Sequence, residues 1–373
     1  MWNFCEEEGP HSDQVLMSPT RTHLFLAVLF VSAMSDAGSA EPSSAGETAI
    51  EECPALKDIT VLTYNIAWGG DGGKNLESIQ RWITGFGKGF DVIALNECNA
   101  MDKNGKLQSF AEASGFSFSV LLRARTGYHL GIMSQRPILV NQTKAHPYHH
   151  GLLEVETFGV RFLVTHLSPA SSDARLAECM DLSSRISELT VEGVPTILLG
   201  DLNTLSPLDK EQHIASHLAQ SLAANDRLKK KFLRQGAAGL EIDYRPMQTL
   251  LDAGFLDLSL ADDSHRPGST DGARCDLDPE EKGSGSSACT VPTLNHLDPM
   301  HAAQMRLDYT LGNAHAHART ACRSVTVRDS RTDVNSDHYP VRAVLAQSLS
   351  AGHACARTST AFVSEHLVLD PAP

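Results

Sequence analysis

The chain has 373 residues, of which 42% are hydrophobic and 20% are charged. A chain with this apolar fraction and no dominant repeat can bury a sizeable core, which excludes disordered and collagen-like proteins. The formal net charge of −14 argues against a protein whose affinity for nucleic acid or anionic membranes rests on bulk charge. A local basic patch stays compatible with this composition, and the length allows one large domain or two ordinary ones.

The first forty residues have the pattern of a secretory signal peptide. A short apolar run at residues 24–33 follows Arg21 and precedes a small-residue stretch that ends at Ala40. About ten apolar residues are too few for a membrane-spanning helix, which needs roughly 20. We therefore expect cleavage after Ala40 and a protein that is secreted or lies in the lumen of the secretory pathway. A buried helix is the alternative interpretation, and Met17 is an alternative start.

Cysteine usage fits a secreted protein without proving it. Of the eight cysteines, one lies in the predicted signal peptide, which leaves an odd number, so at least one lacks an intrachain partner. Cys275 and Cys289 bracket a Gly- and Ser-rich segment and are the best disulfide candidates, whereas Cys98 is expected to be a buried free thiol. The sequence has no Cys-x-x-Cys pair and no His-Glu-x-x-His motif, so a zinc site is not expected.

Apolar runs of strand length alternate along the chain with segments of helical spacing. Runs rich in Val, Ile and Leu predict buried strands at residues 59–64, 92–96, 118–122, 152–156, 160–166, 196–200, 305–311, 323–327 and 338–345. Apolar positions three and four apart predict helices at residues 76–86, 107–114, 173–189, 207–234 and 247–253. The alternation indicates an α/β fold with sheets buried beneath outer helices.

The predicted strands and helices are preceded by a linker at residues 41–56. A surface insertion is predicted at residues 259–305, because this segment is long and rich in Gly, Ser and Asp. Residues 349–373 are expected to be a tail.

Polar residues that can bind metal or transfer protons recur directly after the predicted strands. Strand ends project side chains into a shared crevice, so residues far apart in sequence can converge on one site. For each residue alone, a solvated turn or a capping turn is the more common interpretation. Together they supply the hard oxygen ligands that magnesium requires and histidine–carboxylate pairs for proton transfer. These residues are Asn65, Glu97, His166, Asp201, Asn203, Asp308, Asp337 and His338.

Seven ordered segments carry a resemblance to a known family. They are VLTYNIAWGG, DVIALNEC, GYHLGIMSQRPI, FLVTHLSP, TILLGDLNTLSP, MRLDYTLGN and NSDHYPVRAVL. In order and rough spacing they resemble the endonuclease/exonuclease/phosphatase superfamily, the group of deoxyribonuclease I, exonuclease III-type nucleases, neutral sphingomyelinases and inositol polyphosphate 5-phosphatases. The resemblance covers roughly residues 57–348. It implies an α/β (α+β) fold, a four-layer α/β/β/α sandwich of the deoxyribonuclease I type, and metal-dependent hydrolysis of phosphate esters.

The resemblance also implies a metal site. Glu97 would be the principal ligand of Mg²⁺, with Mn²⁺ as the alternative metal. Asn65 would lie beside Glu97, and Asp337 would complete the metal-side cluster. Whether one or two metal ions bind stays open.

Five residues take catalytic roles under the same resemblance. Asp308 would hydrogen-bond His338 and fix its tautomer. Asp201 would orient or deprotonate the attacking water, Asn203 would hold a phosphate oxygen of the substrate, and His166 would lie by the scissile phosphate. Asp201 and His338 stay as alternative general bases. The transition state spreads negative charge over oxygens, so the metal, the imidazolium groups and Asn203 would stabilise it.

Nucleic acid is the favoured substrate, because residues 336–341 are close to the corresponding segment of deoxyribonuclease I. A phospholipid or small phosphorylated metabolite is the alternative substrate, and a non-catalytic binding protein on the same scaffold is the alternative outside enzymes. Tyr128 and His129 are candidate substrate-binding residues, with ordinary strand positions as the alternative. No obligate protein partner is expected, and the protein is expected to be a monomer.

A basic run at residues 229–231, flanked by Arg227 and Arg234, allows two interpretations. A solvated helix face is the more common origin of such a run, and a phosphate-binding ridge is the alternative.

Overall fold

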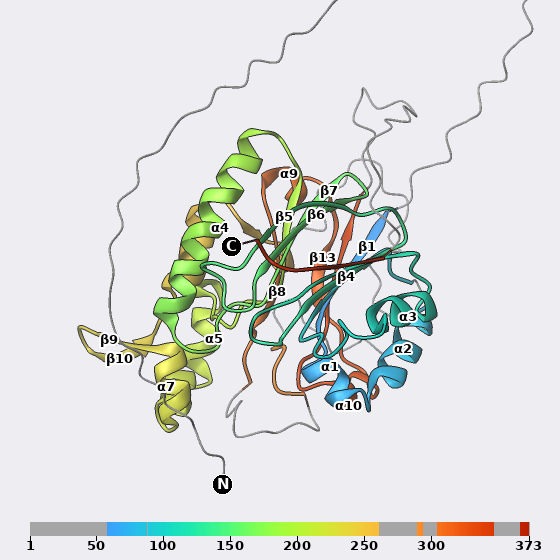
Figure 1. Ribbon diagram of the computed structural model, residues 1–373. Helices are drawn as coiled ribbons and strands as arrows, with labels where there is room; N and C mark the ends of the chain where they lie inside the picture. The colour runs from blue at the N-terminus through green and yellow to red at the C-terminus, as the bar shows by residue number, and fades with distance from the viewer. Residues whose placement is uncertain (1–57, 88, 261–288, 294–303, 347–365, 373) are drawn as a thin grey trace, which may run out of the picture. The chain divides into compact units, whose positions relative to one another are not determined.

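The computed structural model describes residues 58–87, 89–260, 289–293, 304–346 and 366–372 (Figure 1). All of them belong to the second of the chain's two units, Cys53–Pro373. The predicted signal peptide and linker, and most of the predicted surface insertion, lie outside the described residues.

One sheet has seven strands in the order β13-β14-β1-β2-β4-β3-β15. Its two central strands, β1 and β2, pair in parallel and bring Asn65 opposite Asn96 at their C-terminal ends. This pairing places two polar residues at the same edge of the sheet. The strands are β1 (Ile59–Asn65), β2 (Val92–Asn96), β3 (Phe118–Leu122), β4 (Leu130–Ser134), β13 (Thr320–Thr326), β14 (Val341–Leu345) and β15 (His366–Leu369).

A second sheet has six strands in the order β11-β12-β8-β7-β6-β5. β7 and β8 pair in parallel, and β12 runs antiparallel to β8 with Asp308 opposite Asp201. The ends of these strands therefore also gather polar residues. The strands are β5 (Leu139–Lys144), β6 (Leu152–Thr157), β7 (Val160–Thr165), β8 (Thr196–Asp201), β11 (Leu256–Asp257) and β12 (Asp308–Gly312).

Helices and a small hairpin complete the described residues, in which no helix is both long enough and apolar enough to cross a membrane. The helices are α1 (Ala67–Gly72), α2 (Leu76–Thr84), α3 (Lys106–Ala113), α4 (Ser172–Val191), α5 (Lys210–Ala215), α6 (Leu218–Ala223), α7 (Asp226–Phe232), α8 (Arg245–Asp252), α9 (Ala314–His317) and α10 (Thr332–Asn335). The short 3-10 turns are η1 (Pro207–Asp209) and η2 (Leu258–Leu260), and the hairpin is β9 (Leu233–Gly236) with β10 (Gly239–Ile242).

Alternate side chains of each central strand enter different hydrophobic layers. Along β1, Val61 packs between the two sheets, whereas Leu62 packs beneath α2 and α3. Along β7, Phe162 faces the core between the sheets and Leu163 faces α4 and α8. Strands buried on both faces are apolar at nearly every position, which is why the sequence shows them as continuous runs. The predicted four-layer α/β/β/α sandwich is confirmed, with α4 on one side and α2 and α3 on the other (Figure 1).

The segment predicted as one helix at residues 207–234 is a series of short elements instead. After α5, His217 has a positive φ of 52°, which ends the helical path. Before α7, Asn225 is extended and its side chain accepts hydrogen bonds from the backbone N–H groups of Arg227 and Leu228. The turns allow Leu222 and other apolar residues of these short helices to share one separate core. The apolar residues of these short helices have the same spacing as those of one continuous helix, so spacing alone predicts a single helix.

Three further differences concern strands. β4 and β5 were not predicted, and β5 carries polar residues because it lies at the edge of its sheet. Residues 366–369 are not a tail, since β15 pairs in parallel with β3. Within the predicted insertion, Val291 is buried and forms a β-bridge with Met305.

The cysteines correct one expectation. Cys98 is a buried free thiol, as predicted, and Cys179 is another. Cys289 is also free, so its predicted disulfide with Cys275, which lies outside the described residues, is wrong. Among the described cysteines, Cys322 is the disulfide-bonded one.

Candidate active site

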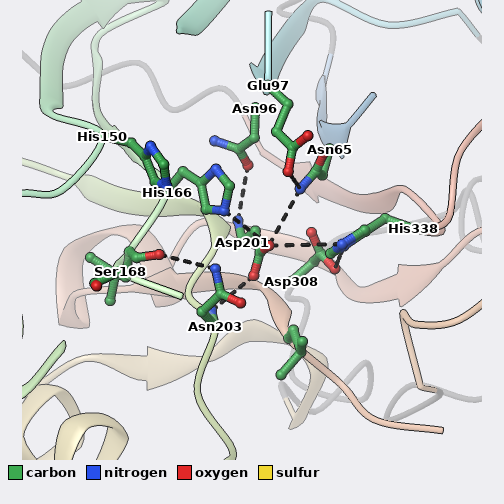
Figure 2. A network of polar contacts seen from close by, with 12 residues as sticks. Asn65, Asn96, Glu97, His150, His166, Ser168, Asp201, Asn203, Asp308 and His338 are labelled. Carbon is green, nitrogen blue, oxygen red and sulfur yellow. Dashed lines mark hydrogen bonds and ion pairs between the residues drawn. The ribbon is translucent and has the colours of Figure 1, made fainter. Parts of the chain in front are cut away.

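Polar side chains from both sheets meet where the central strands end (Figure 2). β1 and β2 of the first sheet end at Asn65 and Asn96. In the second sheet, β8 ends at Asp201, β12 begins at Asp308, and His166 directly follows β7. The packing of one sheet against the other therefore brings together residues that are far apart in the sequence.

Asp201 lies at the centre of this network. Its Oδ2 lies 3.3 Å from His166 Nε2 and 3.8 Å from His338 Nε2. The same oxygen accepts a hydrogen bond of 3.3 Å from Asn65 Nδ2. Its Oδ1 accepts a hydrogen bond of 2.8 Å from the backbone N–H of Asn203. The side chain is buried, so these contacts determine its orientation and its charge.

The neighbouring histidines keep Asp201 ionised. Burial by itself raises the pKa of the carboxyl group, but the hydrogen bond from His166 and the charges of His166 and His338 hold this pKa below its usual range. For His166, burial lowers the pKa, and the contact with Asp201 outweighs burial, so the pKa is raised. The contact therefore favours a carboxylate beside an imidazolium.

His338 is oriented by Asp308. Its Nδ1 lies 2.8 Å from Asp308 Oδ2, which turns Nε2 toward Asp201. Burial lowers the pKa of His338, but the carboxylates of Asp308, Asp337 and Asp201 raise it to about 10. The imidazole is consequently charged at neutral pH. Asp308 is itself held, because its backbone N–H donates to Thr290 Oγ1 at 3.1 Å.

Glu97 faces this centre from the turn after β2. Its carboxylate accepts hydrogen bonds from Asn65 Nδ2 at 3.2 Å and from the backbone N–H of Trp68 at 2.9 Å. Glu97 has a φ of 60° and Asn203 a φ of 49°, a left-handed conformation that costs on the order of 1–3 kcal/mol for such residues. Strain of this kind persists where surrounding structure holds it, and it clusters at functional sites.

Of the predicted metal ligands, Asn65 contacts carboxylates of the site directly, and Asp337 lies next to the network. Asn65 turns Nδ2 toward the carboxylates, while its Oδ1 accepts the backbone N–H of Ala67 at 3.1 Å. In this arrangement Asn65 orients Glu97 rather than offering an oxygen. Asp337 lies next to the network, since Ser336 Oγ donates to the Asn65 carbonyl at 2.7 Å and lies 3.4 Å from Asp337 Oδ1.

The donor chemistry fits a hard divalent cation. Among the described residues, no group of three or more His, Cys, Asp or Glu side chains has metal-binding geometry. Mg²⁺, however, commonly takes only one or two carboxylates and keeps several waters. Glu97 and Asp337 provide such carboxylates, and Asp308 Oδ1 is a buried oxygen without a hydrogen-bond partner.

Asn96 and Gly200 were missed as site residues. Asn96 Nδ2 donates to the carbonyl of Thr165 at 3.0 Å, and its Oδ1 accepts the backbone N–H of Asp201 at 2.9 Å. It thereby ties the first sheet to the second beside the carboxylate of Asp201. Gly200 has a φ of 139°, and a Cβ there would lie 1.9 Å from the Thr165 carbonyl oxygen. A buried Asn at the end of an apolar run is the signal that points to this role.

The ring of His166 packs against that of His150, which in turn contacts two further aromatic rings. The His150 ring lies 4.3 Å from that of His166 at an interplanar angle of 26°. Tyr128 and His149 lie 5.2 Å and 4.5 Å from His150, so the predicted residue Tyr128 reaches the edge of the site. Burial and the charge of His166 lower the pKa of His150 to about 2. His150 is therefore neutral, and its signal in the sequence is the adjacent pair of histidines.

His129 does not face the network. Its Nδ1 accepts the backbone N–H of Ala124 at 3.0 Å, and its Nε2 lies 3.5 Å from Asp102 Oδ1. Its carbonyl accepts the backbone N–H of Cys98 at 2.9 Å. These contacts support the turn that carries Glu97, which argues against the predicted contact of His129 with substrate.

Glu178 and Arg175 of α4 support the loop that carries His166, a role that no local pattern in the sequence indicates. Glu178 accepts the backbone N–H groups of Ser168 at 2.8 Å and His149 at 2.7 Å. Arg175 donates to the Ser168 carbonyl at 2.9 Å. Burial raises the pKa of Glu178 to about 7. The segments carrying His150 and His166 are thus fastened to one helix.

The basic run of α7 divides into two parts. Lys229 and Lys230 are exposed, so the solvated-face interpretation holds for them. Lys231 is buried, and its Nζ lies 4.9 Å from the Phe232 ring centroid. Burial lowers the pKa of Lys231 to about 8, against the opposing effect of the Asp201 charge. Lys231 is therefore within electrostatic reach of the site.

A carboxylate thus lies between two imidazoles whose pKa values are raised, at the strand ends of this sandwich. The sequence matches the model of the Endonuclease/Exonuclease/phosphatase family over residues 62–338, which is more than half of the chain. The chain belongs to this family. No protein with a curated description matches the sequence.

The fold is similar to that of solved structures. An AP endonuclease from Archaeoglobus fulgidus is 14% identical with a TM-score of 0.52, and the match covers 77% of this chain and 99% of that one. The 3′ phosphatase NExo from Neisseria, bound to a product DNA hairpin, is 15% identical with a TM-score of 0.50 and the same coverage, 77% and 99%. At these identities the likeness establishes a shared fold.

Proposed function

We propose that this protein is a divalent-metal-dependent phosphodiesterase that cleaves nucleic acid. The observation that carries the proposal is the convergence of His166 and His338 on the carboxylate of Asp201, with Glu97 facing them. Displacement at phosphorus spreads negative charge over the phosphate oxygens, and fixed positive groups stabilise that charge. Two imidazolium groups and a cation-binding carboxylate around one point provide this arrangement.

The protonation states assign the proton transfers. At neutral pH Asp201 is ionised and His338 is protonated, so Asp201 is the one of the two candidate bases that can accept a proton from water. His338 and His166 then donate hydrogen bonds to the phosphate. Asn203 Nδ2 donates one N–H to the Leu167 carbonyl at 3.0 Å, and its second N–H is available for a phosphate oxygen.

The metal of this proposal is Mg²⁺, with Mn²⁺ as the alternative. Glu97 and Asp337 would hold it, while Asn65 fixes the orientation of Glu97. When bound, such a cation acts as a Lewis acid that neutralises charge on the phosphate.

Nucleic acid is favoured as the substrate for two reasons. Lys231 lies close enough to feel the charge of Asp201, and Arg227, one helical turn earlier, affects the pKa of Tyr128. Through these charge interactions α7 brings positive charge toward the site although the whole chain is acidic. A protein of the same fold, the NExo phosphatase, binds a DNA hairpin. A phospholipid or small metabolite substrate, and a binding protein without activity, are the alternatives that the test must separate.

The test uses Glu97→Gln. With Mg²⁺, the purified protein is expected to release acid-soluble nucleotide from plasmid DNA, and Glu97→Gln is expected to lower the rate by about 100-fold or more, because one metal-binding charge is lost. Addition of EDTA should abolish the wild-type rate. Release of phosphate or phosphocholine from inositol phosphates and phospholipids is measured in parallel.

Glu77→Gln is the matched control, since Glu77 is exposed and pairs with Arg81 on α2. It should keep the wild-type rate. If DNA is not cleaved, and a phospholipid or an inositol phosphate is hydrolysed by the wild type but not by Glu97→Gln, the substrate belongs to the alternative class. Binding of DNA without any turnover would leave a non-catalytic protein.

We also propose that the protein enters the secretory pathway, on the basis of the apolar run at residues 24–33 and the small residues ending at Ala40. Mass spectrometry of the N-terminal peptide of secreted protein is expected to find Glu41 as the first residue. Recovery of an intact Met1 or Met17 would contradict the proposal.

A further inference from the structure

The turn whose backbone contacts the candidate metal carboxylate also carries an exposed indole. Trp68 is 59% exposed, whereas Trp82 is fully buried. The backbone N–H of Trp68 donates to Glu97 Oε2 at 2.9 Å, so the indole belongs to the same turn that orients Glu97. Trp side chains are highly buried on average, and neither the proton transfers nor the metal site described above uses this exposed one.

The turn that carries Trp68 is held by backbone contacts to the segment that follows β2. Trp68 has φ and ψ of 51° and 42°, and the left-handed conformation continues through Asp71, although residues with a Cβ rarely adopt it in succession. Gly69 donates its backbone N–H to the Glu97 carbonyl at 2.7 Å. A Cβ on Gly69 would lie 2.3 Å from the Asn99 carbonyl oxygen. The sequence therefore maintains an unfavourable backbone whose visible result is an indole held in solvent at the active site.

We propose that Trp68 is a stacking platform for an unpaired nucleobase next to the scissile phosphate. The inference rests on the proposed nuclease function and specifies its substrate as nucleic acid with an unstacked base at the cleavage point. A flat aromatic side chain beside a backbone-binding site is how proteins hold single-stranded nucleic acid, since every base has a π-face to stack on. A rigid platform loses little conformational entropy when the base binds.

Insertion into a membrane fits the surroundings of Trp68 less well. Glu97 accepts its backbone N–H, and Asp71, exposed and paired with Lys74 at 2.9 Å, lies three residues further on. An anionic lipid surface is attracted by clusters of Lys and Arg, whereas Glu97 and Asp71 are carboxylates. A nucleobase stacks through its uncharged face, and the charge of the phosphate next to it would be offset by the cation and the imidazolium groups of the proposed site.

The first test compares two single-stranded oligonucleotides of equal length, one normal and one with abasic tetrahydrofuran units in place of nucleosides. Trp68→Ala is expected to lower kcat/KM on the normal oligonucleotide by roughly tenfold or more, and by less than about twofold on the abasic one, where no base can stack. Trp68→Phe, which keeps a ring, should restore most of the rate on the normal substrate. Met180→Ala, which removes a side chain that is 60% exposed on α4, is the control and should change neither rate.

The second test measures binding without turnover in the Asp201→Asn background. The emission of Trp68 is the part of the tryptophan fluorescence that is lost in Trp68→Phe. The normal oligonucleotide should quench this emission. The abasic oligonucleotide and vesicles of phosphatidylcholine and phosphatidylserine should not quench it. If Trp68→Ala hydrolyses both oligonucleotides at the wild-type rate, the stacking role is overturned and the nuclease proposal stands. If no oligonucleotide is hydrolysed, the nuclease proposal fails, and the quenching measurement still decides whether Trp68 binds a base. A response to vesicles alone would overturn the inference in favour of a lipid surface.

Discussion

Asp201→Asn is expected to lower kcat/KM by about 1,000-fold or more without unfolding the protein. The substitution keeps the size of the side chain but removes the negative charge that His166 and His338 face across 3.3 Å and 3.8 Å. It also removes the group that accepts the proton from water in the proposed mechanism. Without this charge the pKa values of both histidines fall, so the transition state loses positive groups as well as a base. Steady-state kinetics with thermal unfolding of the same samples measure the effect.

Asp181→Asn is a matched control for this variant. Asp181 accepts hydrogen bonds from Lys144 and Tyr148 at 2.9 Å and 2.7 Å, away from the active-site network. The same chemical change there should alter kcat/KM by less than about twofold, since exposed or half-exposed pairs contribute little. An Asp201→Asn enzyme that is folded and retains activity within tenfold of wild type would contradict the central role of this carboxylate.

Asp308→Asn is expected to lower kcat by about 10,000-fold, the loss that follows replacement of the carboxylate partner of a catalytic histidine in serine proteases. Asp308 Oδ2 lies 2.8 Å from His338 Nδ1, and it is the neighbour that raises the pKa of His338 most strongly against the effect of burial. The asparagine amide no longer fixes the protonated ring with Nε2 toward Asp201. In the double variant with His338→Asn, the loss should be far less than the product of the single losses, because the two residues act as a unit.

Asp308→Asn should also change how the stability of the metal-free protein depends on pH. The pKa of His338 is raised to about 10, above an unfolded value of about 6.5. The contact of charged His338 with Asp308 therefore contributes fully to the free energy of unfolding below about pH 6.5, and this contribution is lost as the pH rises through about 10. Denaturant unfolding in EDTA should show a difference between wild type and Asp308→Asn that shrinks over this range. A difference that is constant with pH, or that grows at alkaline pH, would show that His338 is not the group concerned.

The central strands and the residues at their ends were predictable because they obey local rules. Buried strands flanked by a second layer on each side are apolar at nearly every position, so β1, β2, β7 and β8 stand out in the sequence. The polar residue after each run then stands out too, which is how Glu97 and Asp201 were found. The parallel register of β1 with β2 and the packing of the two sheets convert these separate positions into one site.

The remaining features depend on contacts that no local pattern encodes. His150 matters because its ring lies on His166, and Asn96 matters because it bonds to Asp201 across the two sheets. The spacing of apolar residues at 207–234 is that of one helix, yet His217 and Asn225 turn the chain. Cys289 lies near Cys275 in sequence, but proximity in sequence did not make them partners.

The parallel pairing of β15 with β3 also bears on how this protein stays in solution. β3 carries Val120, Leu121 and Leu122, and without β15 it would be the edge strand of this sheet, with free N–H and C=O groups. An uncovered apolar edge strand is a template on which a second copy can add its own strand and begin an aggregate. The segment at residues 366–369 covers that edge, fastened by Ser119 to His366 at 2.9 Å and by the Arg123 N–H to the Leu369 carbonyl at 2.8 Å. A short stretch near the C-terminus thus moves the free edge of the sheet from the five-residue, largely buried β3 to the four-residue β15, and a shorter edge strand is a poorer template for pairing between molecules.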